Sequence, residues 1–560
     1  MTKEKGAKLG YLLLVASVVL LCYSVVSTSV LWVEPTDLGL VSRLPITYWV
    51  GLLLVGIIWY IGRTKRFFLL VTLLLTISYL YVAPAIIRVP PWISNSFYPF
   101  GESILINETG HLTYRPSHIL VSYQDWPIFL YFASSLKLVT GLSDVALIKL
   151  FPLFAALSYA LFAVLILRIR MPISHSVLGA AWFLGSFFIR QHYFGPQGFV
   201  YIYFLMGLLI VSWLFFETSE YRNTLSFLLV FLLVLTTLTH PLTSLMLLTV
   251  LLSVYLTYRF ITKKPSSLVV TMCLLSVVLW LAYNGYFAPS FFDQTARNLF
   301  DVLFGEESLG IYSEAGRLVG SRAMLWNFVA SWGTVVLGTG IAALSVLRIL
   351  RKARAKQDIS KLEYSAFISV LLLMLGIFSF SVEYGAVEAY QRAFMFGLVP
   401  ISYLCMDFLS RRQRVLIVLL VALLFLNIPA QYGADTFRLA TDSTLDGAAF
   451  FAHYSPQKVN VIGKLTVYIR YHDPPKEITV PALGLAYPYT SLPNASAVNE
   501  AFLNALAETD YIEVSGLEKN FYRFYLGYNP LEMVDVEGTC NRIYDNSRYW
   551  VFKPANVTSP

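Results

Sequence analysis

The feature that most constrains this chain of 560 residues is a series of long apolar runs separated by short polar segments. A helix needs about 20 mostly apolar residues to cross the hydrocarbon core of a bilayer. Thirteen runs reach or approach this length, which predicts an all-α polytopic membrane bundle of about 13 transmembrane helices. The expected spans are Gly10–Trp32, Ile46–Ile61, Phe67–Ile87, Leu147–Leu167, Val177–Ile189, Gly198–Phe216, Leu225–Leu238, Leu242–Ile261, Leu268–Phe287, Leu325–Leu347, Tyr364–Val382, Ala393–Leu409 and Val415–Ile428.

Composition agrees with this prediction. The chain is 57% hydrophobic and 13% charged, whereas soluble domains are about 45–50% apolar and about 25% charged. The net charge of +8 comes from short basic clusters between the apolar runs. Such clusters are typical of cytoplasmic anchoring, so we expect membrane lipid as a partner and no nucleic acid.

The basic clusters also predict an orientation in the cell membrane. When the N-terminus is placed in the cytoplasm, Lys and Arg concentrate in the inner segments, as the positive-inside rule requires. An odd number of spans then places the end of the chain on the extracytoplasmic side. The expected inner clusters are Lys3, Lys5, Lys8; Arg63, Lys65, Arg66; Arg168, Arg170; Arg222; Arg259, Lys263, Lys264; Arg348, Arg351, Lys352, Arg354, Lys356, Lys361; and Arg411, Arg412, Arg414.

Composition changes after the last apolar run, which divides the chain into a membrane domain at 1–433 and a soluble domain at 434–560. The second part gains Asp, Asn, Pro and Tyr, and short strand and helix patterns predict a small α/β domain. The expected strands are Val459–Ile462, Leu465–Ile469, Tyr511–Val514 and Tyr549–Phe552, and the expected helices are Leu445–His453 and Val498–Ala507.

Polar chemistry is concentrated in the outer segments, chiefly the loops at 89–126 and 288–324 and an amphipathic interfacial helix at 128–142. Glu102 and Asp125 flank the first loop and are the candidate catalytic residues. A carboxylate at the membrane surface can act as a general base for an acceptor hydroxyl or bind a metal ion. Solvated loop acids are the alternative. The four cysteines have no metal-ligand spacing. The sequence therefore establishes no cofactor, and a divalent cation bound by carboxylates stays open.

A short outer turn contains Arg190, His192 and Gln197. Cationic side chains at the interface pair with phosphate groups, so this turn is a candidate substrate-binding segment. An ordinary polar turn between two spans is the alternative interpretation.

Two further segments contain candidate substrate-binding residues. His240 lies at a helix junction, where it either caps a span or faces a polar cavity. Glu388 and Arg392 are four residues apart before a span, so they either pair on one helix face or present a cation to a phosphate leaving group.

Together these segments resemble the GT-C class of polytopic membrane glycosyltransferases, in the archaeal and bacterial style, over nearly the whole chain. The segments that carry the resemblance are Gly101-Glu102-Ser103, Thr109-Gly110-His111, Asp125-Trp126-Pro127, Thr140-Gly141-Leu142, Phe194-Gly195-Pro196-Gln197, Thr239-His240-Pro241-Leu242-Thr243, and Glu388 with Arg392 before the span that contains Pro400. In the soluble part, Asp510-Tyr511-Ile512 and Asn541–Asn546 are similar to segments of soluble domains in such proteins.

The resemblance implies a donor sugar carried on a polyprenyl phosphate of the dolichyl or undecaprenyl type. It implies that an acid in the first outer loop deprotonates a lipid, glycan or protein acceptor, that the anomeric carbon is inverted, and that the lipid phosphate leaves toward cationic residues. The sequence departs from the family at Asn95, where an Asp is usual. Asn cannot act as a base, so either Glu102 or Asp125 takes this role or the protein is a non-catalytic relative.

Two other classes of function stay open at the level of sequence. A transporter or flippase of lipid-linked sugars would favour ionisable residues near the middle of spans, whereas here they cluster at the ends of the runs. A non-catalytic membrane protein would act mainly through its soluble domain.

Overall fold

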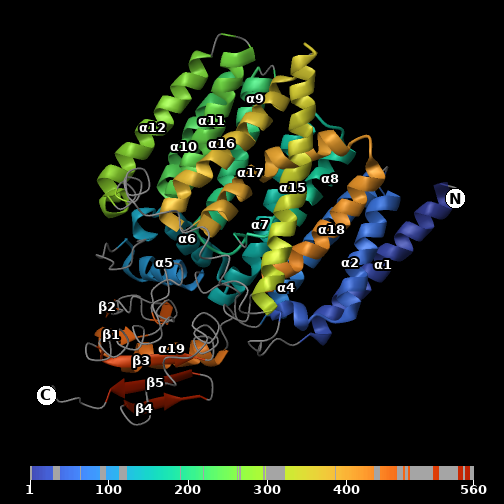
Figure 1. The fold of residues 1–560 in the computed structure, drawn as a ribbon. Coiled ribbons are helices and arrows are strands. Elements are labelled where there is room, and N and C mark those ends of the chain that lie inside the picture. The colour runs from blue at the N-terminus through green and yellow to red at the C-terminus, as the bar shows by residue number, and fades with distance from the viewer. Residues whose placement is uncertain are drawn as a thin grey trace.

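The computed structural model describes residues 3–28, 38–62, 65–88, 96–112, 123–189, 191–217, 220–261, 263, 266–293, 297, 322–357, 359–384, 386–433, 442–462, 469, 471–472, 477–479, 509–515, 540–546 and 549–554. Within these residues the chain forms a large helical bundle and a small mixed sheet that lies at one end of the bundle (Figure 1).

Each of the thirteen apolar runs forms a helix, and among the described residues ten helices are long and apolar enough to cross a membrane. The predicted polytopic helical fold is therefore confirmed. Two of the helices are shorter, with 17 residues in α2 and 14 in α8. The helices are α1 (Lys3–Ser27), α2 (Ile46–Gly62), α3 (Arg66–Ile77) continued by a π-helical turn η2 (Ser78–Val82) and α4 (Ala83–Ile87), α7 (Asp144–Arg168), α8 (Ile173–Ser186), α9 (Pro196–Phe216), α10 (Arg222–Thr239), α11 (Pro241–Ile261), α12 (Ser267–Phe287), α15 (Arg322–Arg354), α16 (Lys361–Tyr384), α17 (Ala386–Leu409) and α18 (Gln413–Tyr432).

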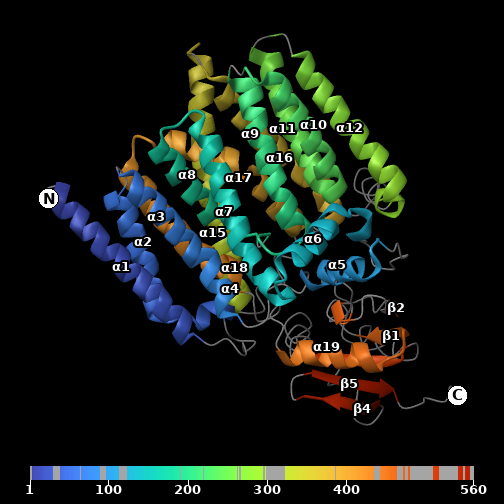
Figure 2. The ribbon, with the colours of Figure 1, turned by 180° about the vertical axis from the view of Figure 1, so that it is seen from behind.

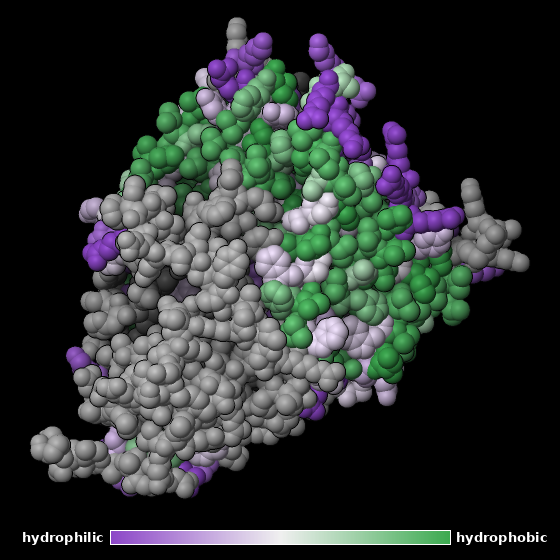
Figure 3. Space-filling view, viewed as in Figure 1, coloured by the Kyte–Doolittle hydropathy of each residue, from purple (hydrophilic) through white to green (hydrophobic). Residues whose placement is uncertain are grey.

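The outer surface of the bundle is apolar, as a bilayer requires. Large hydrophobic side chains such as Leu12, Phe227 and Leu274 are each more than 60% exposed, and the space-filling view shows hydrophobic residues over much of the described surface of the bundle (Figure 3). Charged side chains gather at the end of the bundle opposite the sheet (Figures 1 and 3). This end includes the exposed Arg354 and Lys356.

The short helix α8 ends inside the protein, where its last carbonyl groups have no helical partner. Asn427 Nδ2 donates to the carbonyls of Leu184 (3.3 Å), Gly185 (3.1 Å) and Phe187 (3.3 Å). Gln431 Nε2 donates to Phe187 at 2.8 Å. Both amides lie on α18, so a neighbouring helix satisfies the end of α8. The chain can therefore leave the helix at Ser186 and begin the turn that contains His192.

The C-terminal part contains α19 (Asp442–Tyr454) and, within the described residues, a five-stranded sheet in the order β2-β1-β3-β5-β4. β1 pairs in parallel with β2 and β3, whereas β5 pairs antiparallel with β3 and β4. The predicted small α/β domain is therefore confirmed, although β2 and β4 were not anticipated. The strands are β1 (Lys458–Ile462), β2 (Glu477–Thr479), β3 (Tyr511–Ser515), β4 (Cys540–Asp545) and β5 (Tyr549–Pro554). Of the remaining predictions, residues 465–468 and 498–507 lie outside the described residues, and Ile469 is helical rather than extended.

The sheet lies next to two helices of the first outer segment, α5 (Phe97–Thr109) and α6 (Ile128–Thr140), and both views show this arrangement (Figures 1 and 2). Tyr471 connects the two parts, because its hydroxyl donates to Asp144 Oδ2 at 3.0 Å and its ring lies 5.0 Å from that of Phe97. Asp144 also accepts from Lys137 at 2.8 Å. The C-terminal part is thus held against α5, α6 and the start of α7 by two polar contacts and one ring contact.

Candidate functional site

The segment expected to be a long outer loop contains the helix α5, which corrects the sequence interpretation. Pro99 lies in its first turn, and Gly110, with φ +75°, ends it in the left-handed conformation that glycine adopts without strain. These two signals are readable in the sequence, but the surrounding Pro, Asn and Ser residues favoured a loop. The expected interfacial helix at 128–142 is present as α6, which Gly141 ends in the same way.

Aromatic packing fixes α5 and α6 to the turn before α9. The ring of Phe194 lies 5.2 Å from that of Phe100 and 5.1 Å from that of Phe129, and all three side chains are fully buried. Edge-to-face and tilted contacts of this kind add to the free energy of burial. The outer helices are therefore rigidly positioned over the bundle.

Glu102 is buried within this layer and is only 7% exposed. Its Oε2 accepts a hydrogen bond of 2.7 Å from Gln124 Nε2. Gln124 and Asp125 are neighbours in one tight turn, η4 (Tyr123–Asp125). The Glu102 carboxylate thus holds the turn that presents Asp125.

Asp125 itself keeps a carboxylate oxygen available. Tyr283 donates to its backbone carbonyl at 2.6 Å, whereas Oδ1 is buried and has no hydrogen-bond partner among the described residues. Burial raises the pKa of the Asp125 carboxyl from 3.8 to about 6, because desolvation disfavours the charged form. A carboxylate of this kind is suited to proton transfer near neutral pH.

The helix α12 connects Asp125 with the junction between α10 and α11. Tyr283, which holds Asp125, lies one turn beyond Trp280, whose Nε1 donates to the carbonyl of Pro241 at 3.0 Å. Both side chains pack against the small apolar cluster of Trp126, Ala288 and Phe291. The same helix therefore positions the turn of Asp125 and the residue that follows His240.

Three of the predicted substrate-binding residues, Gln197, His240 and Arg392, come together at neighbouring ends of α9, α10 and α17. Arg392 Nη1 donates to Gln197 Oε1 at 2.8 Å across 195 residues of sequence. Burial and the charge of Arg392 lower the pKa of His240 from 6.5 to about 3, so its imidazole is neutral. Gln197 Nε2 is buried with no hydrogen-bond partner in the described part of the chain. This group presents a guanidinium and an unused amide donor, which suits an anionic ligand.

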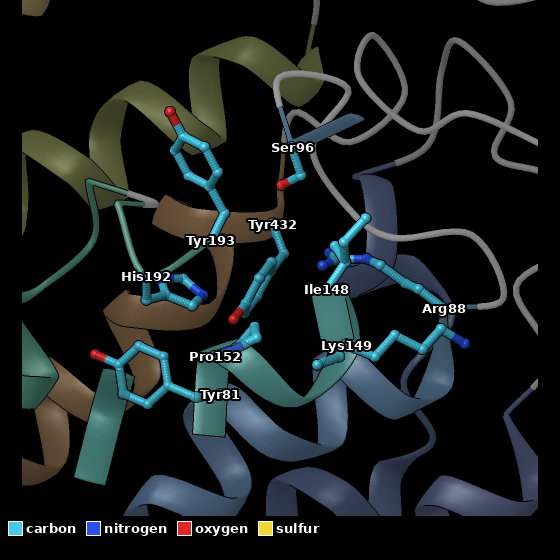
Figure 4. Close-up of a pocket in the computed structure, with 10 residues that line it drawn as sticks. Tyr81, Arg88, Ser96, Ile148, Lys149, Pro152, His192, Tyr193 and Tyr432 are labelled. Carbon is cyan, nitrogen blue, oxygen red and sulfur yellow. The ribbon is translucent and has the colours of Figure 1, made fainter. Parts of the chain in front are cut away.

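His192 does not join that group. It is 1% exposed, lies edge-on to Tyr81 with ring centroids 4.9 Å apart, and lines a separate pocket beside Arg88 and Tyr432 (Figure 4). The sequence did not distinguish Arg88, because a cation that directly follows a span is common at any membrane interface.

Several predictions cannot be compared with the structure. Arg190 and Asn95 lie outside the described residues, as does most of the outer loop at 288–324. Glu388 lies on α17, but its side chain is outside the described set. Among the residues described, no three His, Cys, Asp or Glu side chains gather in a way that could hold a metal ion.

Comparisons with known proteins agree with this architecture. No family model matches the chain, and no curated protein matches its sequence. The archaeal oligosaccharyltransferase AglB from Archaeoglobus fulgidus, solved in complex with an inhibitory peptide and a dolichol-phosphate, has a similar fold. The TM-score is 0.51 at 10% sequence identity, over 88% of this chain and 74% of AglB.

Two lower-scoring matches are ArnT from Cupriavidus metallidurans, bound to undecaprenyl phosphate and in the apo state. Both have a TM-score of 0.45 and 12% identity, and they cover 87% and 83% of this chain and 98% and 94% of the ArnT chains. The chain is a multi-pass membrane protein with the GT-C fold, as its helices and the match to AglB show.

Proposed function

We propose that this protein is a membrane glycosyltransferase that moves a sugar from a polyprenyl phosphate to a lipid, glycan or protein acceptor with inversion. The observation that carries the proposal is that α12 contacts both the turn of Asp125 and the junction beside His240. His240 belongs to the Arg392 group, which consists of Gln197, His240 and Arg392. A base and a cationic group at one outer surface are the two parts that such a transfer requires. The fold shared with AglB, whose structure holds a dolichol-phosphate, supports the same choice of donor.

The proposed orientation places the N-terminus in the cytoplasm and the domain at 434–560 outside the membrane, with the membrane domain at 1–433. Its support is the separation of charge along the bundle. The exposed basic residues of the α15–α16 connection lie at the end opposite the sheet, α5 and α6 (Figures 1 and 3), as the positive-inside rule predicts.

In the proposed reaction, the Asp125 carboxylate accepts the proton of the acceptor's nucleophilic group while that group attacks the anomeric carbon. A bond forms between acceptor and sugar, the bond between the anomeric carbon and the phosphate oxygen breaks, and the electron pair leaves with the lipid phosphate. Attack from the side opposite the leaving group inverts the carbon.

Arg392 and Gln197 stabilise the charge that develops on the phosphate, because charge-assisted hydrogen bonds strengthen as the bond breaks. Because His240 is neutral, Arg392 carries the positive charge of this group. Glu102 is a positioning residue that acts through Gln124. No step of this scheme runs through a metal ion.

The direct test is transfer of labelled sugars from synthetic polyprenyl phosphates by the purified full-length protein in lipid nanodiscs. We expect the wild type to transfer at least one sugar, with large losses for Asp125→Asn and Arg392→Ala and a smaller loss for Glu102→Gln. Asp293→Asn, an exposed acid on the same side of the bundle, is the matched control. Failure of the wild type with every donor would favour a non-catalytic protein, and full activity in both carboxylate variants would disprove the assignment of the base.

A further inference from the structure

A polar pocket lies between the outer ends of α4, α7 and α18 and the turn before α9, and its unfilled space is about 360 Å³ when the adjoining open solvent is included. In Figure 4 the guanidinium of Arg88, the hydroxyl of Ser96 and the ring of His192 approach the ring of Tyr432 from different elements. Lys149 lines the pocket with its stem, and its ammonium group extends away from Tyr432.

The charge of this pocket is positive. Its basic lining residues are Arg88, Lys149 and His192, and no Asp or Glu is among the described residues that line it. Arg88 and His192 are each 1% exposed. Because an electrostatic interaction is screened less in a buried site than in water, this positive potential favours a bound anion.

The donors are held in place before any ligand arrives. The Arg88 guanidinium lies 4.5 Å from the centre of the Tyr432 ring, which restricts its orientation. Tyr432 in turn donates to the carbonyl of Leu80 at 2.7 Å. His192 follows the end of α8, which Asn427 and its neighbours stabilise. A preorganised donor set loses little conformational entropy when a ligand binds.

Ser96 provides independent evidence for a ligand. Its hydroxyl oxygen is buried in the pocket, and the side chain is 1% exposed, yet it has no hydrogen-bond partner among the described residues. Buried polar groups are normally satisfied by protein, water or ligand. A tetrahedral oxyanion in the pocket would accept from Ser96, from the planar fork of Arg88 and from an imidazole N–H.

This pocket is distinct from the group that contains Arg392. None of the residues Gln197, His240 and Arg392 lines it. The two cationic groups also lie on different elements, since Arg88 ends α4 whereas Arg392 lies on α17.

We propose that the pocket of Arg88, Ser96, His192 and Tyr432 is a binding site for the phosphate group of a second ligand. This proposal rests on the proposed function only because the ligand is called second relative to the donor phosphate at Arg392. The phosphate belongs either to the headgroup of an anionic lipid in the outer leaflet or to a soluble phosphate ester, such as a phosphorylated acceptor.

The test measures binding and needs no sugar donor. Full-length protein in phosphatidylcholine nanodiscs is titrated with inorganic phosphate at constant ionic strength held with chloride, and the melting temperature gives the affinity. A parallel series uses nanodiscs that contain phosphatidylglycerol. A response to inorganic phosphate in neutral nanodiscs supports a soluble phosphate ester, and a response only to the anionic lipid supports a headgroup.

The variants locate the site. Loss of a charge-assisted hydrogen bond predicts at least about tenfold weaker binding in Arg88→Gln, with a smaller loss in Arg88→Lys, which keeps the charge but not the planar fork. Ser96→Val changes no charge and is expected to weaken binding several-fold. Arg392→Gln removes only the phosphate response that belongs to the Arg392 group and leaves the response of this pocket. The double variant Arg88→Gln/Arg392→Gln therefore loses both responses, and the two losses add because the sites are separate.

The proposal is overturned if neither phosphate nor anionic lipid stabilises the wild type, or if Arg88→Gln and Ser96→Val both bind as the wild type does. It is also overturned if Arg392→Gln alone removes the whole response, because there is then one site. Sugar transfer by the same preparations is measured separately, so a failure of the transferase proposal leaves the binding result intact.

Discussion

Two of the polar clusters in this apolar bundle, one at the end of α8 and one around Asp125 and Gln197, use their hydrogen-bonding groups in opposite ways. At the end of α8, the amide nitrogens of Asn427 and Gln431 are directed at backbone carbonyls of the same fold. In the second cluster, which we call the outer cluster after its proposed orientation, Asp125 Oδ1 and Gln197 Nε2 are buried with no hydrogen-bond partner among the described residues.

The difference separates structural from functional polarity. A buried polar group without a partner costs free energy, so such a group at a candidate site suits a ligand that can satisfy it. The α8 cluster repairs a helix end that the bundle itself created, although Gln431 Oε1 also has no partner within the described chain. In the proposed function, the substrates satisfy the groups of the outer cluster. Substitutions in the first cluster should therefore reduce stability, and substitutions in the second should reduce activity.

The largest expected effect belongs to Asp125→Asn. Removal of a general base reduces the rate of transfer by about 10² to 10⁴-fold, with little change in the melting temperature because the ionised carboxyl is itself poorly solvated. The measurement is kcat/KM for transfer beside a thermal melt of the same sample. A variant that melts much lower than the wild type would place Asp125 with the structural residues.

Arg392→Gln is expected to reduce the rate of transfer by about 10²-fold, because a donor to the developing charge is lost while the contact with Gln197 can in part be kept. Arg412→Gln, an exposed cation at the other end of the bundle, is the control. Equal losses in the two variants would indicate a general effect of charge rather than a specific contact.

The rate of transfer should also depend on pH through Asp125. Because burial raises the pKa of this carboxyl to about 6, the base is protonated and inactive below that value. We expect kcat/KM to rise about tenfold per pH unit up to pH 6 and then to level off. An inflection near the ordinary Asp value of 3.8 would mean that burial does not perturb this group in the working protein.

Asn427→Leu tests the structural cluster. It leaves three carbonyl contacts unmade and should lower the free energy of unfolding by about 1–3 kcal/mol. The activity of the remaining folded protein should change little. Denaturation in mixed micelles measures the loss, and Gln413→Leu, at an exposed position of the same helix, is the control. Wild-type stability in Asn427→Leu would show that the α8 end needs no cap.

The smallest effect is expected for Tyr471→Phe, which removes the hydrogen bond to Asp144 but keeps the ring contact with Phe97. A hydrogen bond to a charged group contributes about 1.5–3 kcal/mol, and here that loss affects only the docking of the C-terminal part. Hydrogen exchange in α19 and the sheet should rise several-fold while that of the bundle is unchanged. Tyr454→Phe, an exposed tyrosine of α19, should have no effect.

Much of this fold was readable from local sequence, and so were the pieces of the site. Apolar runs predicted every long helix, and Asp125, Gln197, His240 and Arg392 were recognised as polar residues at outer segments. Their roles in catalysis and binding stay predictions. The helix α5 was missed because its polar residues resemble those of a loop, and Arg88 was missed because a cation at the end of a span has an ordinary explanation.

The sequence by itself determined that the chain spans a membrane and that its basic residues concentrate in alternate connecting segments, because hydropathy and charge are properties of single segments. Only the tertiary structure decided which polar residues meet. The contact between Gln197 and Arg392 spans 195 residues, and the one between Asn427 and Gly185 spans 242. Such pairs follow from helix packing, in which each side chain finds its partner on another segment.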